Sequence, residues 1–229
     1  MIKFKQYILL VVCTIGFVTI NLAQSNSVPI TNGIGVYGGL TQFNIITDNF
    51  KTKKGAGWIA GASATVDIPH RWYNMSYSIQ LSENIVGIEA RPLIGSVTKE
   101  FIDYKLFTAQ IALLMHVKLV ESYLTIDAGP MLQYNSELEL EDNKHKNFVI
   151  NNYNNLLAED ISDISKFNFI GAIGLSGGAS HFRLKAQYLY GFTNMLNKLN
   201  KNDLDTSGIS KEKFKGNQSM LAFTLMISF

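Results

Sequence analysis

The four histidines are the residues of this chain best suited to acid–base chemistry, and a hydrolytic site would need a nucleophile and a carboxylate beside one of them. His70 and His181 fall in short predicted turns, and His116 lies near the end of a predicted strand. His145 stands in a Lys-His-Lys stretch of a long polar segment. Because no spacing places these bases beside a fixed nucleophile, we predict that the chain is not an enzyme.

A second group of polar residues carries charge at positions that alternate with apolar residues. The group consists of Asp67, Glu89, His116, Lys118, Asp127, Arg183 and Lys185. All except Glu89 fall toward the same end of the predicted fold. Because charges inside a fold are tolerated only when they are paired, we predict an interior ion-pair network that closes the interior at this end.

Other bound groups find little support in the sequence. It has no metal-ligand spacing and no glycine-rich phosphate loop followed by a helix, so no cofactor is predicted. Cys13 is the only cysteine and lies in a segment predicted to be removed, which leaves no thiol for a disulfide or a metal. A formal net charge of +2 without a basic aromatic stripe predicts no nucleic-acid binding.

The chain begins with a segment that has the features of an export signal. In residues 1–23, two lysines precede an apolar run over 7–20, and the small residue Ala23 ends the segment. The run is shorter than the roughly 20 residues that a membrane-spanning helix needs, which disfavours an anchor. We predict cleavage after Ala23, which leaves residues 24–229 as one mature domain.

Strands must position the charged residues, because the mature chain alternates apolar with polar or small residues over segments of about ten residues. Eight such segments are predicted, at 34–43, 58–68, 77–90, 107–120, 124–133, 169–178, 182–193 and 220–229. In the third, the apolar parity changes between Leu81 and Val86, which predicts a β-bulge near residues 83–85.

The two faces of these strands distinguish a soluble barrel from a membrane barrel. One face carries the bulky Phe, Leu and Ile residues, and the other mixes Gly, Ser, Thr and Gln with the charges. A soluble barrel would have to bury those charges or expose the apolar face, at a cost of several kcal/mol for each unpaired ion. The pattern therefore predicts an all-β, eight-stranded antiparallel up-and-down transmembrane β-barrel with its apolar face toward lipid.

The predicted connections alternate in length, as in outer-membrane barrels with long outside loops and short periplasmic turns. The long ones are 44–57, 91–105, 135–166 and 194–217, and two of the short ones are two-residue turns. Both termini then lie on the periplasmic side of the outer membrane of a Gram-negative bacterium. Aromatic residues near the strand ends predict interface girdles, with Trp58, Phe107, Tyr134, Phe169 and Phe192 outside and Trp72, Tyr77, Phe182 and Phe229 inside.

The two largest loops carry opposite charge. The third is acidic, and its segment 155–165 can form a short helix, while the fourth carries five lysines. We consider two arrangements, one in which these loops lean together across the barrel mouth and one in which each is separately solvated.

Several motifs resemble a known family. They are the signal end Leu22-Ala23-Gln24, the glycine-rich segment 33–39, the segment 124–130 and the terminal Phe229. They look like the small outer-membrane β-barrel proteins of Bacteroidetes called PorT-like, which share the eight-stranded barrel of the OmpA and OmpX type. The resemblance implies that the barrel-assembly machinery reads Phe229 as its signal.

We predict an integral outer-membrane protein that is not an enzyme and that stabilises the envelope or presents its loops to a partner. The expected partners are outer-membrane lipids, the barrel-assembly machinery and an envelope or secretion-complex protein. The family resemblance implies one alternative, an accessory component of a secretion and gliding machinery. Likeness in architecture to barrels that modify lipid A implies another, a lipid-modifying enzyme.

Overall fold

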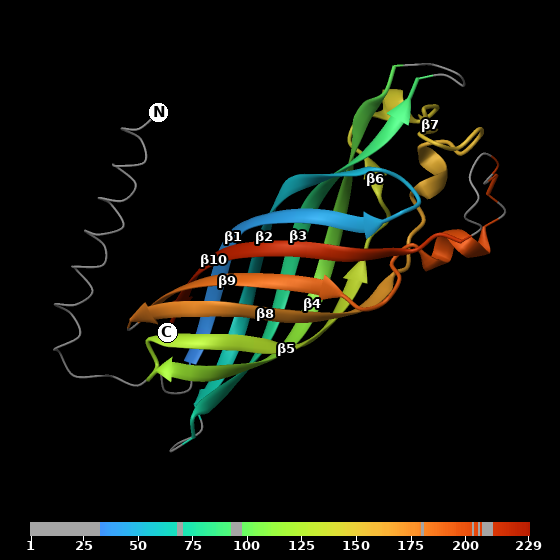
Figure 1. Cartoon of the computed structure of the whole chain (residues 1–229). Helices are drawn as coiled ribbons and strands as arrows, with labels where there is room; N and C mark the ends of the chain where they lie inside the picture. The colour runs from blue at the N-terminus through green and yellow to red at the C-terminus, as the bar shows by residue number, and fades with distance from the viewer. Residues whose placement is uncertain are drawn as a thin grey trace, which may run out of the picture.

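The chain forms a closed ring of eight antiparallel strands, shown in Figure 1. The computed structural model describes residues 33–67, 71–92, 98–179, 181–202, 204–205, 207 and 213–229. The ring consists of β1 (Gly33–Thr47), β2 (Thr52–Asp67), β3 (Tyr73–Arg91), β4 (Glu100–Val120), β5 (Leu124–Asn135), β8 (Phe167–Ala179), β9 (Phe182–Gly191) and β10 (Gly216–Ser228). Pairing of β1 with β10 closes it, which confirms the predicted eight-stranded antiparallel barrel. The predicted signal at 1–23 lies outside the described residues.

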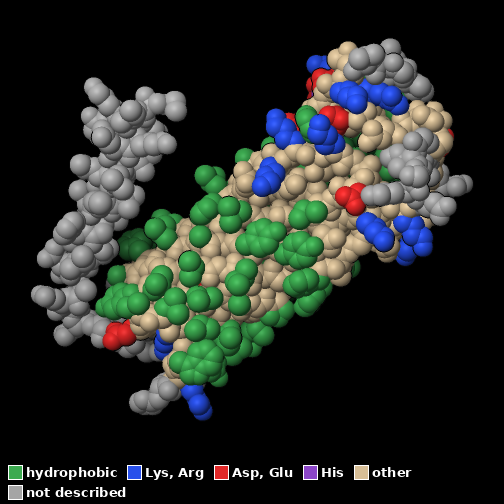
Figure 2. Space-filling view, in the orientation of Figure 1, with side chains coloured by type: hydrophobic (Ala, Val, Ile, Leu, Met, Phe, Trp, Pro, Cys, Tyr) green, Lys and Arg blue, Asp and Glu red, His purple; other side chains and the backbone are tan. Residues whose placement is uncertain are grey.

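The outside of the ring is apolar on every strand. Each strand exposes at least one large apolar side chain, among them Leu40, Val66, Ile79, Ile111, Leu132, Ile173, Leu184 and Phe223. All nine aromatic residues of the predicted girdles are exposed as well. Figure 2 shows apolar side chains spread over the visible barrel wall and lysine and arginine side chains gathered mainly at the opposite end from the short turns. The lipid-facing parity that the sequence predicts is therefore the outward one.

Strands β1 to β4 are longer than predicted. β3 continues to Arg91 and β4 begins at Glu100, so the connection between them is shorter than the predicted loop 91–105. The predicted loop 44–57 is likewise reduced to a short connection between Thr47 and Thr52. The alternation of apolar and polar residues does not reveal these extensions, because their outward residues, such as Asp103 and Lys105, are polar.

The inward face of β3 changes character along its length. Ser78, Gln80 and Ser82 are buried and polar, whereas Val86 and Ile88, which continue the same parity, are buried and apolar. The change of apolar parity in the sequence therefore marks the level at which the interior becomes hydrophobic. The predicted bulge near 83–85 is wrong for β3, because the register shift lies in the partner strand β2, between Lys54 and Gly57.

Two of the long connections fold over the end of the barrel, and we call them the cap: residues 136–166 and 192–215, as far as they are described. Its short strands β6 (Glu139–Leu140) and β7 (Val149–Ile150) pair with the extensions of β4 and β3. Its other elements are three short 3₁₀ helices, η1 (Asn143–His145), η2 (Glu159–Ile161) and η3 (Asn197–Lys201).

The helix predicted over 155–165 is wrong apart from the single turn of η2. Packing of this segment into the cap replaces the hydrogen bonds of a longer helix with contacts to other segments, such as the bond from the Ala158 amide to the Phe148 carbonyl. No helix among the described residues has the length and apolar character needed to cross a membrane.

Candidate functional site: a filled lumen beneath a folded cap

The inside of the barrel, its lumen, contains a compact polar cluster near the short turns. Nδ1 of His116 lies 2.7 Å from Oδ1 of Asp127, and Nε2 of His116 lies 2.7 Å from Oγ of Ser76. The three residues come from β4, β5 and β3, which are neighbours in the ring. Asp127 is completely buried, so its carboxylate depends on these partners for solvation.

Hydroxyl groups and two cations extend this cluster across the lumen. Thr125 donates a hydrogen bond of 2.7 Å to Oδ1 of Asp127, and its hydroxyl is 2.7 Å from that of Ser176. Arg183 donates to the Ser176 hydroxyl at 3.0 Å. Lys185 is buried, with its amino group 5.3 Å from the centre of the Tyr37 ring, a cation–π contact.

The structure thus brings together four of the seven residues predicted for the interior network: His116, Asp127, Arg183 and Lys185. Lys118 lies at the same end, with its amino group 3.4 Å from the carbonyl oxygen of Arg71. Asp67 ends β2 opposite Asn74, and its side chain lies outside the described part of the structure. Glu89 is not part of this cluster, because it lies near the other end of β3, beside the cap.

Ser76, His116 and Asp127 stand in the order of a serine–histidine–aspartate triad, which the sequence did not reveal because the three residues lie on separate strands. Ser76 is 1% exposed, however. The neighbouring cavity has a volume of about 30 Å³ and is lined by His116, Arg183 and Lys185 among others, but not by Ser76. A cavity of this size holds one or two waters, so it offers no room for a substrate beside the hydroxyl.

A chain of glutamines crosses the lumen above the charged cluster. Tyr37 donates a hydrogen bond of 2.7 Å to Gln80, which is bonded in turn to Gln110, and Gln110 to Gln133. Gln133 and Gln218 exchange two bonds of 2.5 and 2.9 Å. Because β8 and β9 separate β5 from β10 in the ring, this last pair spans the lumen. The alternation in the sequence predicts polar residues on the inner face but not the hydrogen bonds that join them.

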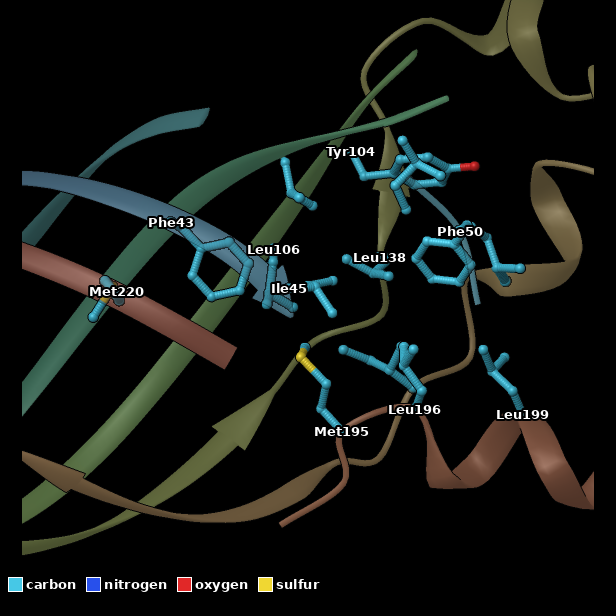
Figure 3. Close-up of a cluster of buried hydrophobic side chains, with 14 of the residues drawn as sticks. Phe43, Ile45, Phe50, Tyr104, Leu106, Leu138, Met195, Leu196, Leu199 and Met220 are labelled. Atoms are coloured by element: carbon cyan, nitrogen blue, oxygen red, sulfur yellow. The ribbon is translucent and has the colours of Figure 1, made fainter. Parts of the chain in front are cut away.

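Above the glutamines, the interior becomes a hydrophobic core shared by the barrel and the cap, as Figure 3 shows. Phe43, Leu106 and Met220 come from the barrel strands, and Leu138, Met195 and Leu196 come from the cap. Ile150, Leu156, Ile161 and Ile164 of the cap are also fully buried. The two large loops therefore meet, as in the first of the two arrangements considered from their charges, and apolar packing contributes most of the contact.

Polar contacts fix the cap to the strand extensions. Tyr104 donates a hydrogen bond of 2.9 Å to the Ala158 carbonyl. Glu89 accepts bonds from Lys51 at 3.2 Å and from Asn151 at 2.5 Å. Arg91 donates to the Tyr153 carbonyl at 2.5 Å. These bonds satisfy groups that the cap would otherwise bury without partners.

An ion pair joins the two loops of the cap, with Nζ of Lys198 2.6 Å from Oδ1 of Asp163. Both side chains are partly exposed, so the pair contributes at most about 1 kcal/mol. We expect Asp163→Lys to increase proteinase K cleavage of the cap by up to about fivefold and Asp163→Lys with Lys198→Asp to restore resistance. Glu159→Lys, which reverses the charge of an exposed residue in the same loop, is the matched control. Equal cleavage of all variants would contradict a contribution from this contact.

A second polar contact between the loops depends on pH. The side chain of Asn155 donates a hydrogen bond of 2.6 Å to Asp205, and this bond and those from Ser207 lower the pKa of the Asp205 carboxyl. The contact is then complete above the unfolded pKa of about 3.9 and is lost as pH falls through the lowered value. We expect Asn155→Ala to raise the titration midpoint observed at the Ser207 amide by NMR. An unchanged midpoint would show that Asn155 does not stabilise the carboxylate.

Comparison with known proteins finds likeness in solved structures alone. No protein-family model matches the chain, and no match is found among curated proteins. Neisserial surface protein A is 12% identical, with a TM-score of 0.46 over 86% of this chain and 97% of that one. Ail, the attachment invasion locus protein of Yersinia pestis, is 11% identical in its complex with the heparin analogue sucrose octasulfate, with a TM-score of 0.45 over 87% of this chain and 100% of that one.

The outer membrane protein OprG from Pseudomonas aeruginosa is 11% identical, with a TM-score of 0.45 over 88% of this chain and 97% of that one. LpxR from Salmonella typhimurium has a TM-score of 0.26 at 7% identity. The resemblance to PorT-like proteins stays a prediction.

Proposed function

We propose that the chain is an integral outer-membrane protein with a closed lumen, which presents a rigid folded cap outside the cell and performs no catalysis. The observation that carries this proposal is the inversion of the fold. Large apolar side chains are exposed all around the barrel wall, while polar and charged side chains are buried in the lumen. Such a wall is stable where lipid covers it, and a closed barrel satisfies its backbone hydrogen bonds without water.

The orientation of the barrel follows from its connections. The turns after β4 and β8 are short, whereas the cap is built from two long connections at the other end of the barrel. Outer-membrane barrels have their short turns in the periplasm and their long loops outside. The cap therefore faces the exterior.

The lumen favours a structural or binding role over transport. Below the cap it contains the glutamine chain and the charged cluster, and above them lie fully buried apolar residues such as Ile45 and Leu106. An eight-stranded barrel leaves an interior just wide enough for side chains to fill. The cap then remains as the surface that a partner or the environment meets, and loops on a rigid scaffold commonly carry recognition.

Cysteine labelling on intact cells tests the orientation. In a Cys13→Ser background, K146C places a thiol in the cap and E121C places one in a short turn. We expect a membrane-impermeant maleimide to label K146C on intact cells and E121C only after the outer membrane is permeabilised. Labelling of E121C alone on intact cells would reverse the proposed orientation.

Two measurements on the purified barrel test the remaining parts of the proposal. In planar bilayers we expect no stable conductance, because packed side chains fill the lumen, and stable steps would show an open path. We also expect a fluorophosphonate, which reacts with activated serines, to leave Ser76 unmodified. Modification of Ser76 that His116→Ala abolishes would overturn the non-enzymatic assignment.

A further inference from the structure

The outer wall of the barrel has a hollow of about 440 Å³ that crosses β5, β8, β9, β10 and β1. A row of paired residues runs through it, from Leu124 through Gly177, Leu184 and Leu225 to Gly38. Leu40, Leu175 and Phe223 border the hollow on the adjoining row. All of these positions except the glycines present apolar side chains outward, so the hollow opens toward lipid and its rim is hydrocarbon.

Two glycines in this hollow, Gly38 and Gly177, lie at positions where the neighbouring strands leave room for a side chain. A Cβ atom added at Gly38 would have its nearest neighbour at 3.8 Å, and one added at Gly177 would have its nearest at 3.6 Å, both ordinary contacts. In contrast, a Cβ at the adjacent Gly39 or Gly178 would collide with the backbone of the neighbouring strand. Because glycine weakens a strand, its presence at these two open positions calls for another reason.

We propose that this hollow holds an acyl chain of a membrane phospholipid. Leucine and phenylalanine side chains form its outward rim. The polar residues among its lining, Ser176, Lys185 and Thr224, are buried, so the hollow suits a hydrocarbon chain. It lies in the half of the wall next to the short turns, since Leu124 begins β5 and Leu184 is near the start of β9. In the proposed orientation this half faces the inner leaflet, which places phospholipid chains beside it. The inference rests on the proposed insertion of the barrel in the outer membrane.

A second copy of the chain fits the hollow less well. In a two-fold symmetric dimer the same surface meets itself, so one hollow would face the other and leave a void between them. Voids forfeit the dispersion contacts that hold apolar surfaces together in lipid, where no hydrophobic effect adds to them. A flexible chain can follow the concave wall and restore these contacts.

Photolabelling with a defined lipid tests the proposal. The full-length mature barrel is reconstituted in vesicles of phosphatidylethanolamine and phosphatidylglycerol that contain phosphatidylethanolamine with a diazirine in its acyl chain. After irradiation, labelled peptides are located by mass spectrometry. We expect labelling around Leu184 and Leu225 to exceed labelling around Ile79 and Leu132, which are exposed on the wall outside the hollow, by about threefold.

Filling the hollow should remove this preference. In Gly38→Leu with Gly177→Leu, for which the Cβ distances leave space, we expect labelling around Leu184 to fall to the level of the rest of the wall. Ala62→Leu with Ala64→Leu, which enlarges exposed residues of β2 that do not line the hollow, is the matched control and should keep the preference. Even labelling of the unaltered barrel, or a preference that survives filling, would overturn the proposal.

Two further readouts separate the possible failures. The heat-modifiable shift of the barrel in SDS gels reports insertion and folding for each sample. If the unaltered barrel does not insert into the vesicles, both the proposed function and the proposed lipid site are contradicted. If it inserts and labels evenly, only the lipid site fails. A dimer seen by light scattering that disappears in the filled variant would assign the hollow to a second copy and overturn the proposal.

Discussion

Replacing Leu156 with alanine is expected to open the cap while the barrel stays folded. Leu156 is fully buried, and its removal from a packed core costs about 2–5 kcal/mol. The Leu156 carbonyl accepts the hydrogen bond of the Ile150 amide at 2.9 Å, so that amide reports the opening directly. We expect its protection against hydrogen exchange to fall at least about thirtyfold, because 1.4 kcal/mol corresponds to a factor of ten.

Leu157→Ala provides the matched control for this variant, because the neighbouring leucine is only partly buried. In Leu157→Ala the protection of the Ile150 amide should fall much less. Amides of the barrel strands, such as that of Ile111, should stay protected in both variants. Trypsin should cut the Leu156→Ala protein faster after Lys144 and Lys146, which lie in the cap. Equal protection in the two variants would mean that the cap is not held by its apolar core, and the proposed rigid outer surface would lose its basis.

Removal of the Asp127 carboxylate is expected to destabilise the barrel more than removal of any surface charge. Asp127→Ala takes away the acceptor of His116 and Thr125 and leaves Lys185 buried without its negative neighbour. Breaking one side of a buried charged cluster costs about 3–5 kcal/mol. In phosphatidylcholine vesicles we expect a clear fall in the urea concentration at which half of the inserted barrel unfolds.

Glu141→Ala is the matched control, because it breaks an exposed ion pair with Lys105 whose atoms lie 3.3 Å apart. An exposed pair contributes about 0–1 kcal/mol, so the urea midpoint of the Glu141→Ala barrel should stay close to that of the unaltered barrel. Asp127→Asn, which keeps an oxygen acceptor but removes the charge, should fall between the two. If Asp127→Ala and Glu141→Ala shift the midpoint equally, the luminal cluster does not stabilise the barrel.

The candidate site was only partly predictable from the sequence. The alternation around His116 and Asp127 placed both side chains on the inner face, because the direction of a strand side chain depends only on its parity. The distance of 2.7 Å between them depends on the register of β4 and β5, in which His116 faces Asp127. Ser76 joins them through the register of β3 with β4, and the glutamine chain requires the ring to be closed.

Glu89 shows where strand parity misleads. The sequence assigned it to the lumen because the apolar parity of β3 changes before it, at Val86. In the structure the inward parity is unchanged, and the inner surface itself turns from polar to apolar where the cap packs against it. Glu89 is consequently an outward residue covered by Lys51 and Asn151, far along β3 from the charged cluster.

The sequence by itself determined the number of strands, their antiparallel order and the inverted distribution of polar and apolar residues. These properties follow from local alternation and from the lengths of connections, which one stretch of chain displays without reference to another. Only the tertiary structure decided how the long loops fold, because the apolar residues of the cap follow no period and bury themselves against strands far away in the chain. The strand register that brings Ser76, His116 and Asp127 together also depends on distant partners, so the sequence alone does not show it.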